Sequence, residues 1–390
     1  MNLFRSRMAA AVVAGVFCLS ANLAIAEPAE EIMKSRLGTT EVDPAIAKAI
    51  EIAAKPLTPE LEAKALECWK NDVCETGTGG ELTIAYADGF GENVWRRVTK
   101  MEFIQQALAY QEIGKIQYSS ARGDVSKAIA DLNAYIAQGV NIIVLYADAG
   151  PALLPTVREA KEAGITVVLN NGQEVGTAGE DYVSTVHEDL CALGQDMVKA
   201  VVADKPSAKA LVALGGTPGN TLSATWQKCA QEQADASSIK ILAKLDTNWT
   251  QEGTFTAVSA ALAQYGDFDG WIYEYADGFR AAMRAYQAAG KDVDTVAALR
   301  TDEQGLFCDW EAANSSKFRI YYSASGTTVT ARFAVSAAMM AQAGETVSPW
   351  IKVPFSMKTV KKGLCDKNLP METPVSTLVN AKTLKAMFPN

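Results

Sequence analysis

Histidine is almost absent from this chain. His187 is the one histidine among the 390 residues. Catalysis by a Ser-His or Cys-His pair is therefore disfavoured, and a metal site with several histidine ligands is excluded. Basic residues are also in the minority, with 36 Lys and Arg against 45 Asp and Glu and a net charge of −9. Binding to a phosphate backbone needs clustered Lys and Arg. We therefore expect no enzyme activity, no cofactor, no metal and no nucleic-acid partner.

Long apolar runs are missing beyond the first 26 residues. In residues 1–26, two arginines precede an apolar run that ends in Ala-Ile-Ala, the small-x-small pattern of a cleaved export signal. We predict cleavage before Glu27 and a mature chain that does not insert stably into a membrane. The alternative is an uncleaved anchor, which the polar Ser20 and Asn22 disfavour because they interrupt the apolar run.

Free thiols are not expected in the exported chain. Six of the seven cysteines remain after cleavage, and an even number in an oxidising compartment favours disulfides. A zinc site is the competing interpretation, but no Cys-x-x-Cys pair or nearby histidine supplies the ligand spacing. Of the 15 possible pairings of six cysteines, neighbourhood in the sequence favours Cys68 with Cys74, Cys191 with Cys229, and Cys308 with Cys365.

The chain is long enough for two domains. Residues 27–80 are helical and polar in character and end in the run TGTGG, which indicates an N-terminal extension and a linker. Beyond them, short Val/Ile/Ala/Tyr-rich runs alternate with segments of helical periodicity, the pattern of βαβ units and parallel sheets. Ten such runs are too many for one small sheet. The expected strands are 82–88, 115–120, 140–147, 165–170, 182–186, 210–216, 239–245, 268–275, 295–300 and 318–324.

A crossover helix is expected between the second and third strands. Val125, Ile129, Leu132 and Ile136 follow one another at spacings of four, three and four residues. Such spacing places all four side chains on one buried helix face.

A short repeat follows three of these strands. YADGF occurs at 86–90 and at 275–279, and YAD occurs at 146–148. Ligands of open α/β sheets lie outside the carboxyl ends of the strands, so the aspartates of these segments are candidate ligand contacts. The alternative, which does not exclude ligand contact, is that Asp88, Asp148 and Asp277 cap the following helices.

Four segments together carry a family resemblance: LTIAYADGFGENVWRRV, LNAYIAQGVNIIVLYADAG, AKEAGITVVLNN and LGGTPGNTLSATWQK. In this order they resemble the type I periplasmic sugar-binding proteins, the ribose- and galactose-binding family that delivers substrates to ABC importers. The resemblance runs from about Leu82 to Ala343. No single motif is diagnostic; the order of strand, polar-aromatic loop and helix is what is specific.

The resemblance implies an α/β fold with two doubly wound parallel-sheet lobes, joined by a three-strand hinge and preceded by the helical extension. The chain would cross near 184–188, 322–326 and 350–356. The expected organisation is a signal peptide at 1–26, an extension at 27–80, lobe one at 81–186 plus 326–352, and lobe two at 187–325 plus 353–390.

The family's ligand-facing positions can be carried over residue by residue. After the fourth strand the family commonly has an aspartate-arginine pair, whereas this chain has Asn170 and Asn171. The charged side chains that usually bind the sugar hydroxyls at this point are therefore missing. Two amides can still bond hydroxyl groups in both directions. The expected ligand contacts are Asp88, Asn93, Trp95, Arg96, Asn170, Asn171, Trp226, Trp249, Tyr275, Asp302 and Ser325.

The aromatic members of this set fit a sugar site on chemical grounds as well. Sugar pockets combine flat apolar faces with a few placed polar groups, and these aromatics stand at polar turns rather than within apolar runs. The alternative is that they are core or lobe-interface residues, the usual position of a tryptophan. His187 falls at an expected hinge crossing and is assigned a structural role.

The function implied by the resemblance is a periplasmic, monomeric binding protein that captures a sugar or polyol and delivers it to an ABC permease. A cytoplasmic repressor of the same fold would need a DNA-binding helix-turn-helix and no export signal. Two alternative functions remain: a sugar-sensing input protein for a chemotaxis or signalling receptor, and an exported hydrolase that uses paired carboxylates such as Asp88 and Asp302.

Overall fold

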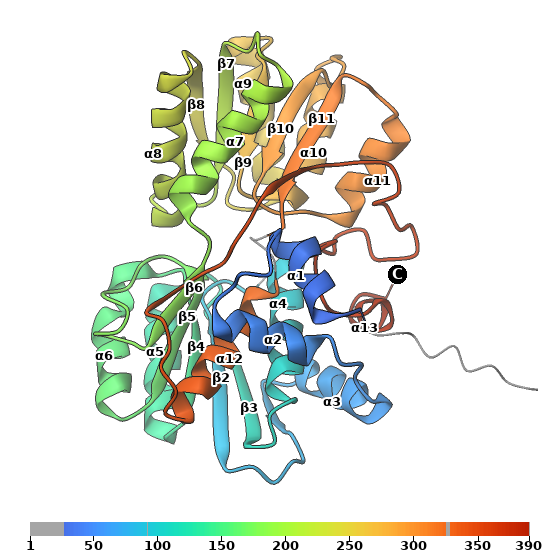
Figure 1. The fold of residues 1–390 in the computed structure, drawn as a ribbon. Coiled ribbons are helices and arrows are strands. Elements are labelled where there is room, and N and C mark those ends of the chain that lie inside the picture. Colours follow the sequence, from blue (N-terminus) through green and yellow to red (C-terminus); the bar gives the residue numbers. More distant parts are fainter. Residues whose placement is uncertain (1–26, 92, 325–327, 390) are drawn as a thin grey trace, which may run out of the picture.

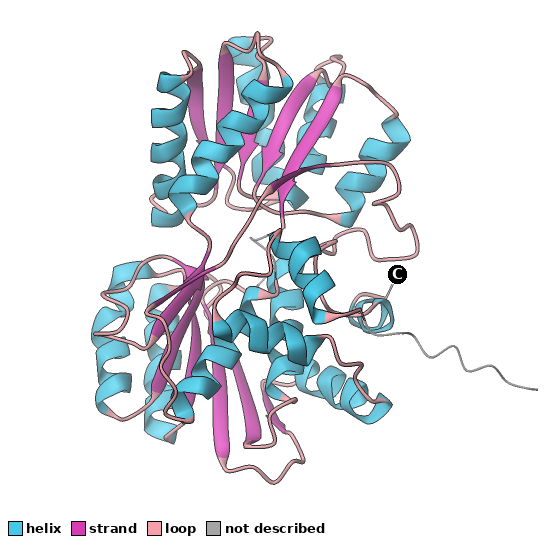
Figure 2. Ribbon diagram, viewed as in Figure 1, coloured by secondary structure: helices cyan, strands magenta, loops and turns pink. Residues whose placement is uncertain are grey.

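The structure is a computed structural model that describes residues 27–91, 93–324 and 328–389. The expected signal peptide, residues 1–26, lies outside the described residues. Two α/β lobes stand one above the other, and thin crossing segments join them near the middle of the molecule (Figure 1). Each lobe has a sheet between layers of helices (Figure 2). This is the predicted fold class.

The first lobe is built on a seven-stranded sheet in the order β1-β3-β2-β4-β5-β6-β12, parallel except for β1. Successive side chains alternate between its two faces. Ile84 and Tyr86 pack with one hydrophobic core, whereas Ala85 and Ala87 pack with another. The strands are β1 (Val73–Glu75), β2 (Leu82–Asp88), β3 (Ile113–Ser120), β4 (Ile142–Ala147), β5 (Thr166–Gly172), β6 (Ser184–His187) and β12 (Trp350–Lys352).

Helices cover both faces of this sheet. Side-chain caps begin two of them, since Asn93 accepts from the backbone N–H of Arg96 and Asp124 from that of Lys127. The expected crossover helix is present, but Val125 is 44% exposed because it lies in the first turn, and only Leu132 of the four predicted side chains is fully buried. The helices are α4 (Val94–Ala107), α5 (Val125–Gln138), η1 (Gly150–Leu153), α6 (Leu154–Glu162) and α12 (Thr330–Gln342).

The second lobe repeats the architecture. Its six-stranded sheet has the order β13-β11-β10-β9-β7-β8, in which only β13 is antiparallel to its neighbour. Its strands are β7 (Ala210–Gly215), β8 (Lys240–Asp246), β9 (Gly270–Tyr273), β10 (Thr295–Leu299), β11 (Phe318–Ser323) and β13 (Met357–Thr359). Its helices are α7 (Leu190–Asp204), α8 (Thr221–Ala236), α9 (Gln251–Tyr265), α10 (Ala276–Ala288) and α11 (Gln304–Ala313).

Among the described residues, the chain crosses between the lobes at three places. It leaves the first sheet after β6, returns after β11, and crosses again between β12 and β13. His187 lies at the first crossing, where its ring stacks on Trp350 with a centroid distance of 5.3 Å. All ten expected strands exist, with ends that differ from the expected ones by at most two residues.

The N-terminal extension packs against the first lobe rather than standing apart from it. Ile46, Ala49 and Ile50 are buried in the same core as α4 and α12. Just before the TGTGG run lies β1, whose register pairs Cys74 with Ile116 of β3 at the edge of the sheet. The extension consists of α1 (Ala29–Leu37), α2 (Pro44–Ala53) and α3 (Pro59–Lys70).

The C-terminal tail, expected wholly in lobe two, returns to the first lobe. The carboxylate of Asp302 in lobe two accepts from the backbone N–H of Val375 at 2.9 Å. Three residues later, the carboxylate of Glu102 in α4 accepts from the N–H of Leu378 at 2.8 Å. The final helix, α13 (Ala381–Met387), then packs near α3. Two buried carboxylates thus hold the tail to both lobes.

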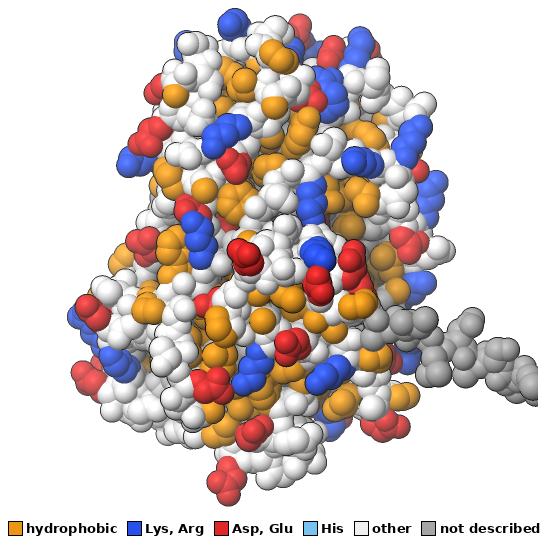
Figure 3. Space-filling view, in the orientation of Figure 1, with side chains coloured by type: hydrophobic (Ala, Val, Ile, Leu, Met, Phe, Trp, Pro, Cys, Tyr) orange, Lys and Arg blue, Asp and Glu red, His pale blue; other side chains and the backbone are white. Residues whose placement is uncertain are grey.

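The cysteines lie in the three pairs that the sequence favoured. Disulfides join Cys68 to Cys74, Cys191 to Cys229, and Cys308 to Cys365. Among the described residues, no helix combines the length and apolar character needed to cross a bilayer. On the face shown in Figure 3, acidic and basic side chains are interspersed.

Candidate ligand-binding cavity between the lobes

A small cavity of about 40 Å³ lies between the two lobes. It is bounded by the loops that follow the carboxyl ends of the strands, as expected for paired α/β lobes. Its lining combines aromatic faces with a few polar groups, the usual composition of a small-molecule site. The lining residues are Phe90, Asn93, Trp95, Arg96, Tyr146, Asp148, Gly172, Asn220, Leu222, Trp249, Glu274, Tyr275, Arg300 and Thr301.

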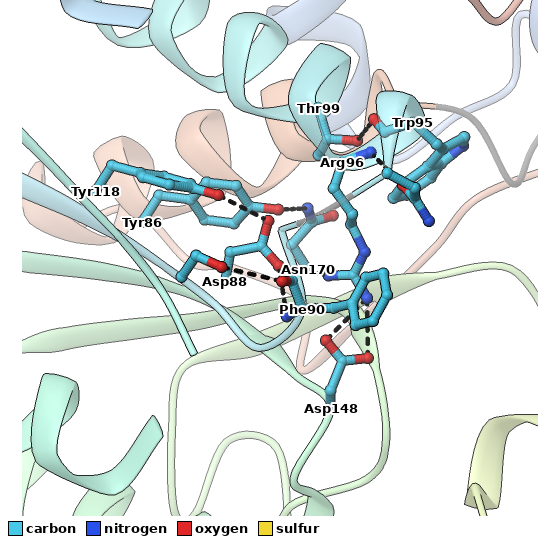
Figure 4. Close-up of polar contacts among 11 residues, drawn as sticks. Tyr86, Asp88, Phe90, Trp95, Arg96, Thr99, Tyr118, Asp148 and Asn170 are labelled. Carbon is cyan, nitrogen blue, oxygen red and sulfur yellow. Dashed lines mark hydrogen bonds and ion pairs between the residues drawn. The ribbon is translucent and has the colours of Figure 1, made fainter. Parts of the chain in front are cut away.

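Arg96 joins two of the YAD aspartates within the first lobe (Figure 4). Its Nη1 donates to Oδ1 of Asp88 at 2.8 Å, and its Nη2 donates to both carboxylate oxygens of Asp148 at 2.8 Å. The guanidinium also lies over the ring of Tyr146, 3.2 Å from its centroid. Two carboxylates therefore pair with the single charge of Arg96.

Burial raises the pKa of Asp148 to about 6, although the neighbouring Arg96 opposes this shift. Asp88 lies behind Arg96, is 2% exposed and does not line the cavity. The aspartate that the cavity presents is therefore Asp148.

Arg300 holds a second ion pair at the hinge. Its Nε donates to the carboxylate of Glu188, and its Nη2 donates to Oδ1 of Asn171 at 3.0 Å. Burial opposes ionisation of Glu188, but the guanidinium of Arg300 holds the pKa of that carboxyl below its ordinary value. Arg300 belongs to lobe two and Asn171 to lobe one, so their hydrogen bond spans the lobes.

Glu274 follows β9 and is a hydrogen-bond acceptor for two tryptophans. Its Oε2 accepts from Nε1 of Trp226 at 2.6 Å, and its Oε1 accepts from Nε1 of Trp249 at 3.0 Å. Burial raises the pKa of Glu274 above its ordinary value. Trp226 is fully buried in the core beneath the sheet, whereas Trp249 lines the cavity.

The lobes contact each other around the cavity. Oε1 of Gln173 in lobe one accepts from the backbone N–H of Thr221 in lobe two at 3.0 Å and from its hydroxyl at 2.9 Å. The structure therefore shows a closed arrangement.

Several polar groups of the lining keep unused hydrogen-bonding capacity. The carboxamide oxygens of Asn93 and Asn220 cap α4 and α8, and among the described residues their NH2 groups have no acceptor. Nη1 of Arg300 likewise has no partner there. With the carboxylate of Asp148, this gives the cavity both donors and acceptors, the complement of a polyhydroxyl compound.

The profile of the periplasmic binding protein domain family matches residues 86–341. The chain belongs to this family. In sequence, no curated protein matches this binding protein significantly.

Solved structures of the same fold cover most of the chain. A solute-binding protein of an ABC transporter from Mycobacterium smegmatis, with bound glycerol, is 21% identical with a TM-score of 0.62, over 73% of this chain and 95% of that one. One from Bacillus halodurans with bound myo-inositol is 16% identical with a TM-score of 0.62, over 73% and 96%. A 5-methylthioribose-binding protein from Thermotoga lettingae is 20% identical with a TM-score of 0.61, over 79% and 92%.

Five of the predicted ligand contacts line the cavity of this binding protein. They come from both lobes, and their contact with ligand stays a prediction. These residues are Asn93, Trp95, Arg96, Trp249 and Tyr275.

Five other predicted contacts do not line this cavity. Asp88 is turned toward Arg96, and Asn170 is fully buried near the hydroxyl of Tyr86. The side chain of Asn171 donates a hydrogen bond to the hydroxyl of Thr330 and accepts one from Arg300. Trp226 and Asp302 are buried, the first donating to Glu274 and the second accepting from the C-terminal tail. The remaining predicted contact, Ser325, lies outside the described residues.

The residues that the sequence missed stand close to those that it named. Glu274 immediately precedes Tyr275, and Arg300 lies two residues before Asp302. The family's positions, carried over residue by residue, thus fall beside Glu274 and Arg300 rather than on them. The YAD repeat at 146–148 had already indicated Asp148 as a candidate contact, and it was a usable signal for Tyr146. The lining residues that the sequence missed are Phe90, Tyr146, Gly172, Asn220, Leu222, Glu274, Arg300 and Thr301.

Proposed function

We propose that this protein captures a neutral sugar or polyol between its lobes in the periplasm and presents it to the permease of an ABC importer. Membership of the periplasmic binding protein family and the bound glycerol, myo-inositol and 5-methylthioribose of the structural neighbours support this proposal. The residues of the cavity make it more specific.

The observation that carries the proposal is the balance of charge at an aromatic-walled cavity. Arg96 is held by Asp88 and Asp148, and Arg300 is held by Glu188. Among the lining residues that the structure describes, both arginines are already paired with carboxylates, so a ligand carboxylate would find no unpaired cation and would approach the carboxylates of Asp148 and Glu274. Unpaired buried charge is costly, so a neutral ligand with hydroxyl groups fits better than a sugar acid.

A titration panel tests the ligand class. The purified mature chain is titrated with glycerol, myo-inositol, D-fructose, L-arabinose and a sugar acid such as D-galactonate, with tryptophan fluorescence as the readout. Because Trp95 and Trp249 line the cavity, a bound ligand should change the emission. We expect at least one neutral compound to bind and the sugar acid not to bind. Binding of the sugar acid alone would contradict the prediction of a neutral ligand. No change in fluorescence with any compound of the panel would contradict the proposed function.

Delivery, location and oligomeric state need separate measurements. We expect the liganded protein to stimulate ATP hydrolysis by its reconstituted importer, the mature protein to begin at Glu27, and light scattering to give a monomer.

A sensory role is the second candidate function. It is supported by a structural neighbour, the fructose-binding periplasmic domain of a hybrid two-component system, at 17% identity and a TM-score of 0.63. Binding of a receptor domain rather than stimulation of a transporter would favour it.

The hydrolase alternative gains no support from the predicted carboxylate pair. Asp88 bonds Arg96 in the first lobe, and Asp302 accepts from the C-terminal tail. Neither lines the cavity, so these two carboxylates do not flank a common ligand position.

A further inference from the structure

We infer that Glu274 is the positioning residue that fixes Trp249 as a wall of the cavity and so sets which face of the ligand is recognised. This inference rests on the proposed binding function. Its structural part, the fixing of Trp249, can be tested without any ligand.

The backbone at Trp249 is unusual. Asn248 and Trp249 both have positive φ angles, of 54° and 51°. A left-handed conformation is uncommon for a bulky residue and costs roughly 1–3 kcal/mol, so it persists only where surrounding contacts hold it. The loop before α9 therefore depends on interactions made by its side chains.

One of these interactions is a close approach of the indole to Gly216. A Cβ atom placed on Gly216 would lie 2.1 Å from Cε2 and 2.2 Å from Cζ2 of Trp249. Any other residue at this position would push the ring away. The backbone after β7 thus supports the indole from behind.

The other interaction is the hydrogen bond to Glu274. Its Oε1 accepts from Nε1 of Trp249 at 3.0 Å and from the hydroxyl of Ser223 at 2.5 Å, and its Oε2 accepts from Trp226. Glu274 is 2% exposed, and Trp226 and Ser223 are buried. The buried helix α8 therefore anchors the carboxylate, and the carboxylate anchors the indole of Trp249.

This arrangement has a consequence for recognition. The indole N–H of Trp249 donates to Glu274 and its backbone N–H donates to the hydroxyl of Thr247, so Trp249 offers the ligand no free hydrogen-bond donor. It presents carbon surface alone, which suits the C–H face of a sugar or cyclic polyol. Ligands with such a face should therefore be preferred over open-chain polyols of similar size.

The indole N–H signals in a ¹H–¹⁵N NMR spectrum test the structural part. The Trp249 signal is assigned by its loss in Trp249→Phe. In ligand-free Glu274→Ala we expect it to move upfield and to exchange faster with water, because it has lost a charged acceptor. If the chemical shift of the Trp249 signal does not change, Glu274 does not accept a hydrogen bond from Trp249 and the inference fails. Should Glu274→Ala fail to fold, Glu274→Leu, which keeps much of the size of the side chain but has no hydrogen-bond acceptor, is measured in the same way.

A double-mutant cycle tests the positioning role, with myo-inositol or the tightest neutral compound of the panel as the probe. Glu274→Ala should weaken binding about tenfold in the wild-type chain. In the Trp249→Phe background the same change should cost less than threefold, because no N–H is left to position. Trp310→Phe is the matched control: it removes an indole N–H of the same lobe that donates to the backbone of Phe318 away from the cavity, and should change affinity less than threefold.

Two results would overturn the inference. An equal loss in both backgrounds would mean that Glu274 acts on the ligand directly or through the fold. An unchanged affinity beside a shifted Trp249 signal would mean that the fixed indole does not matter for binding. If no compound of the panel binds the wild-type protein, the proposed function fails, while the NMR result still decides whether Glu274 holds Trp249.

Discussion

Phe90 of the first lobe and Trp249 of the second lobe meet at the cavity, with ring centroids 6.4 Å apart and ring planes at 69°. An edge-to-face pair of this kind contributes roughly 0.5–1.5 kcal/mol beyond the area it buries. Because both rings also line the cavity, this contact between the lobes is also part of the candidate ligand site.

Trp249 is the first residue to test. Replacing it with Ala should weaken ligand binding by about 2 kcal/mol or more, as truncation of a buried aromatic anchor does, while circular dichroism shows an intact fold. Phe255→Ala is the control, because Phe255 lies in α9 of the same lobe and is 36% exposed. Equal affinities for the wild type and a folded Trp249→Ala would make Trp249 a packing residue.

Arg96 allows a test of charge in the site. Lysine presents one compact ammonium group and cannot span Asp88 and Asp148 as the guanidinium does. Arg96→Lys should therefore weaken binding of a neutral ligand about tenfold or more by calorimetry, and affinity should hardly change between low and high salt. The neighbouring Arg97→Lys is the control, since Arg97 lies between the rings of Trp69 and Phe388. Binding of sugar acids alone, abolished in Arg96→Lys, would refute the neutral ligand.

Asp148 predicts a pH dependence. With a pKa raised to about 6 by burial, its carboxylate gains a proton as the pH falls from 7 to 5 and becomes a weaker acceptor for Arg96 and for ligand hydroxyl groups. Affinity should therefore fall over this range, and Asp148→Asn should bind more weakly at pH 7 but lose much of the pH dependence. Asp131→Asn, at an exposed pair with Lys127, should behave as the wild type. An unchanged profile in Asp148→Asn would assign the titration to another group, such as Glu274.

The disulfides predict the redox state of the mature chain. Thiol counting under denaturing, non-reducing conditions should find no free thiol, because all six mature cysteines are paired. Reduction should lower the unfolding temperature, and a Cys308→Ser/Cys365→Ser variant should lose a few kcal/mol of stability, since this bridge closes the longest loop, a sequence separation of 57 residues. Two or more free thiols would contradict the pairing.

The contacts of Glu102 with the C-terminal tail allow a test of how the tail is held to the first lobe. Its buried carboxylate accepts from Arg332, Thr377 and the backbone of Leu378. Glu102→Ala leaves the guanidinium of Arg332 buried without its partner and should cost about 3–5 kcal/mol in chemical unfolding. Glu62→Ala, which breaks the exposed contacts of the tail at Asn380 and Lys382, should cost less than about 1 kcal/mol. Similar costs for both would mean that burial of Glu102 is not decisive.

Local pattern was sufficient for the strands and for the pairing of cysteines. The run from Leu82 to Asp88 is a strand with the predicted ends, because β-branched and aromatic residues between polar turns suit a buried parallel strand. Cys68 and Cys74 are near neighbours in the chain, so their pairing needed no knowledge of the fold. Val125 shows the limit of periodicity, since the first turn of a helix can extend beyond the sheet that the helix covers.

The two-lobed α/β architecture could be predicted from the sequence, which also named five residues that line the cavity: Asn93, Trp95, Arg96, Trp249 and Tyr275. The folded structure was needed to show that Glu274 and Arg300 line the cavity, while Trp226 supports Glu274 from the core and Asp302 holds the tail. The physical reason is the range of the interactions involved. Strand and helix patterns depend on neighbours in the chain, whereas the partner of a buried charge or indole N–H, such as Asp148 for Arg96, is found on a distant segment whose position is set by the packing of the whole lobe.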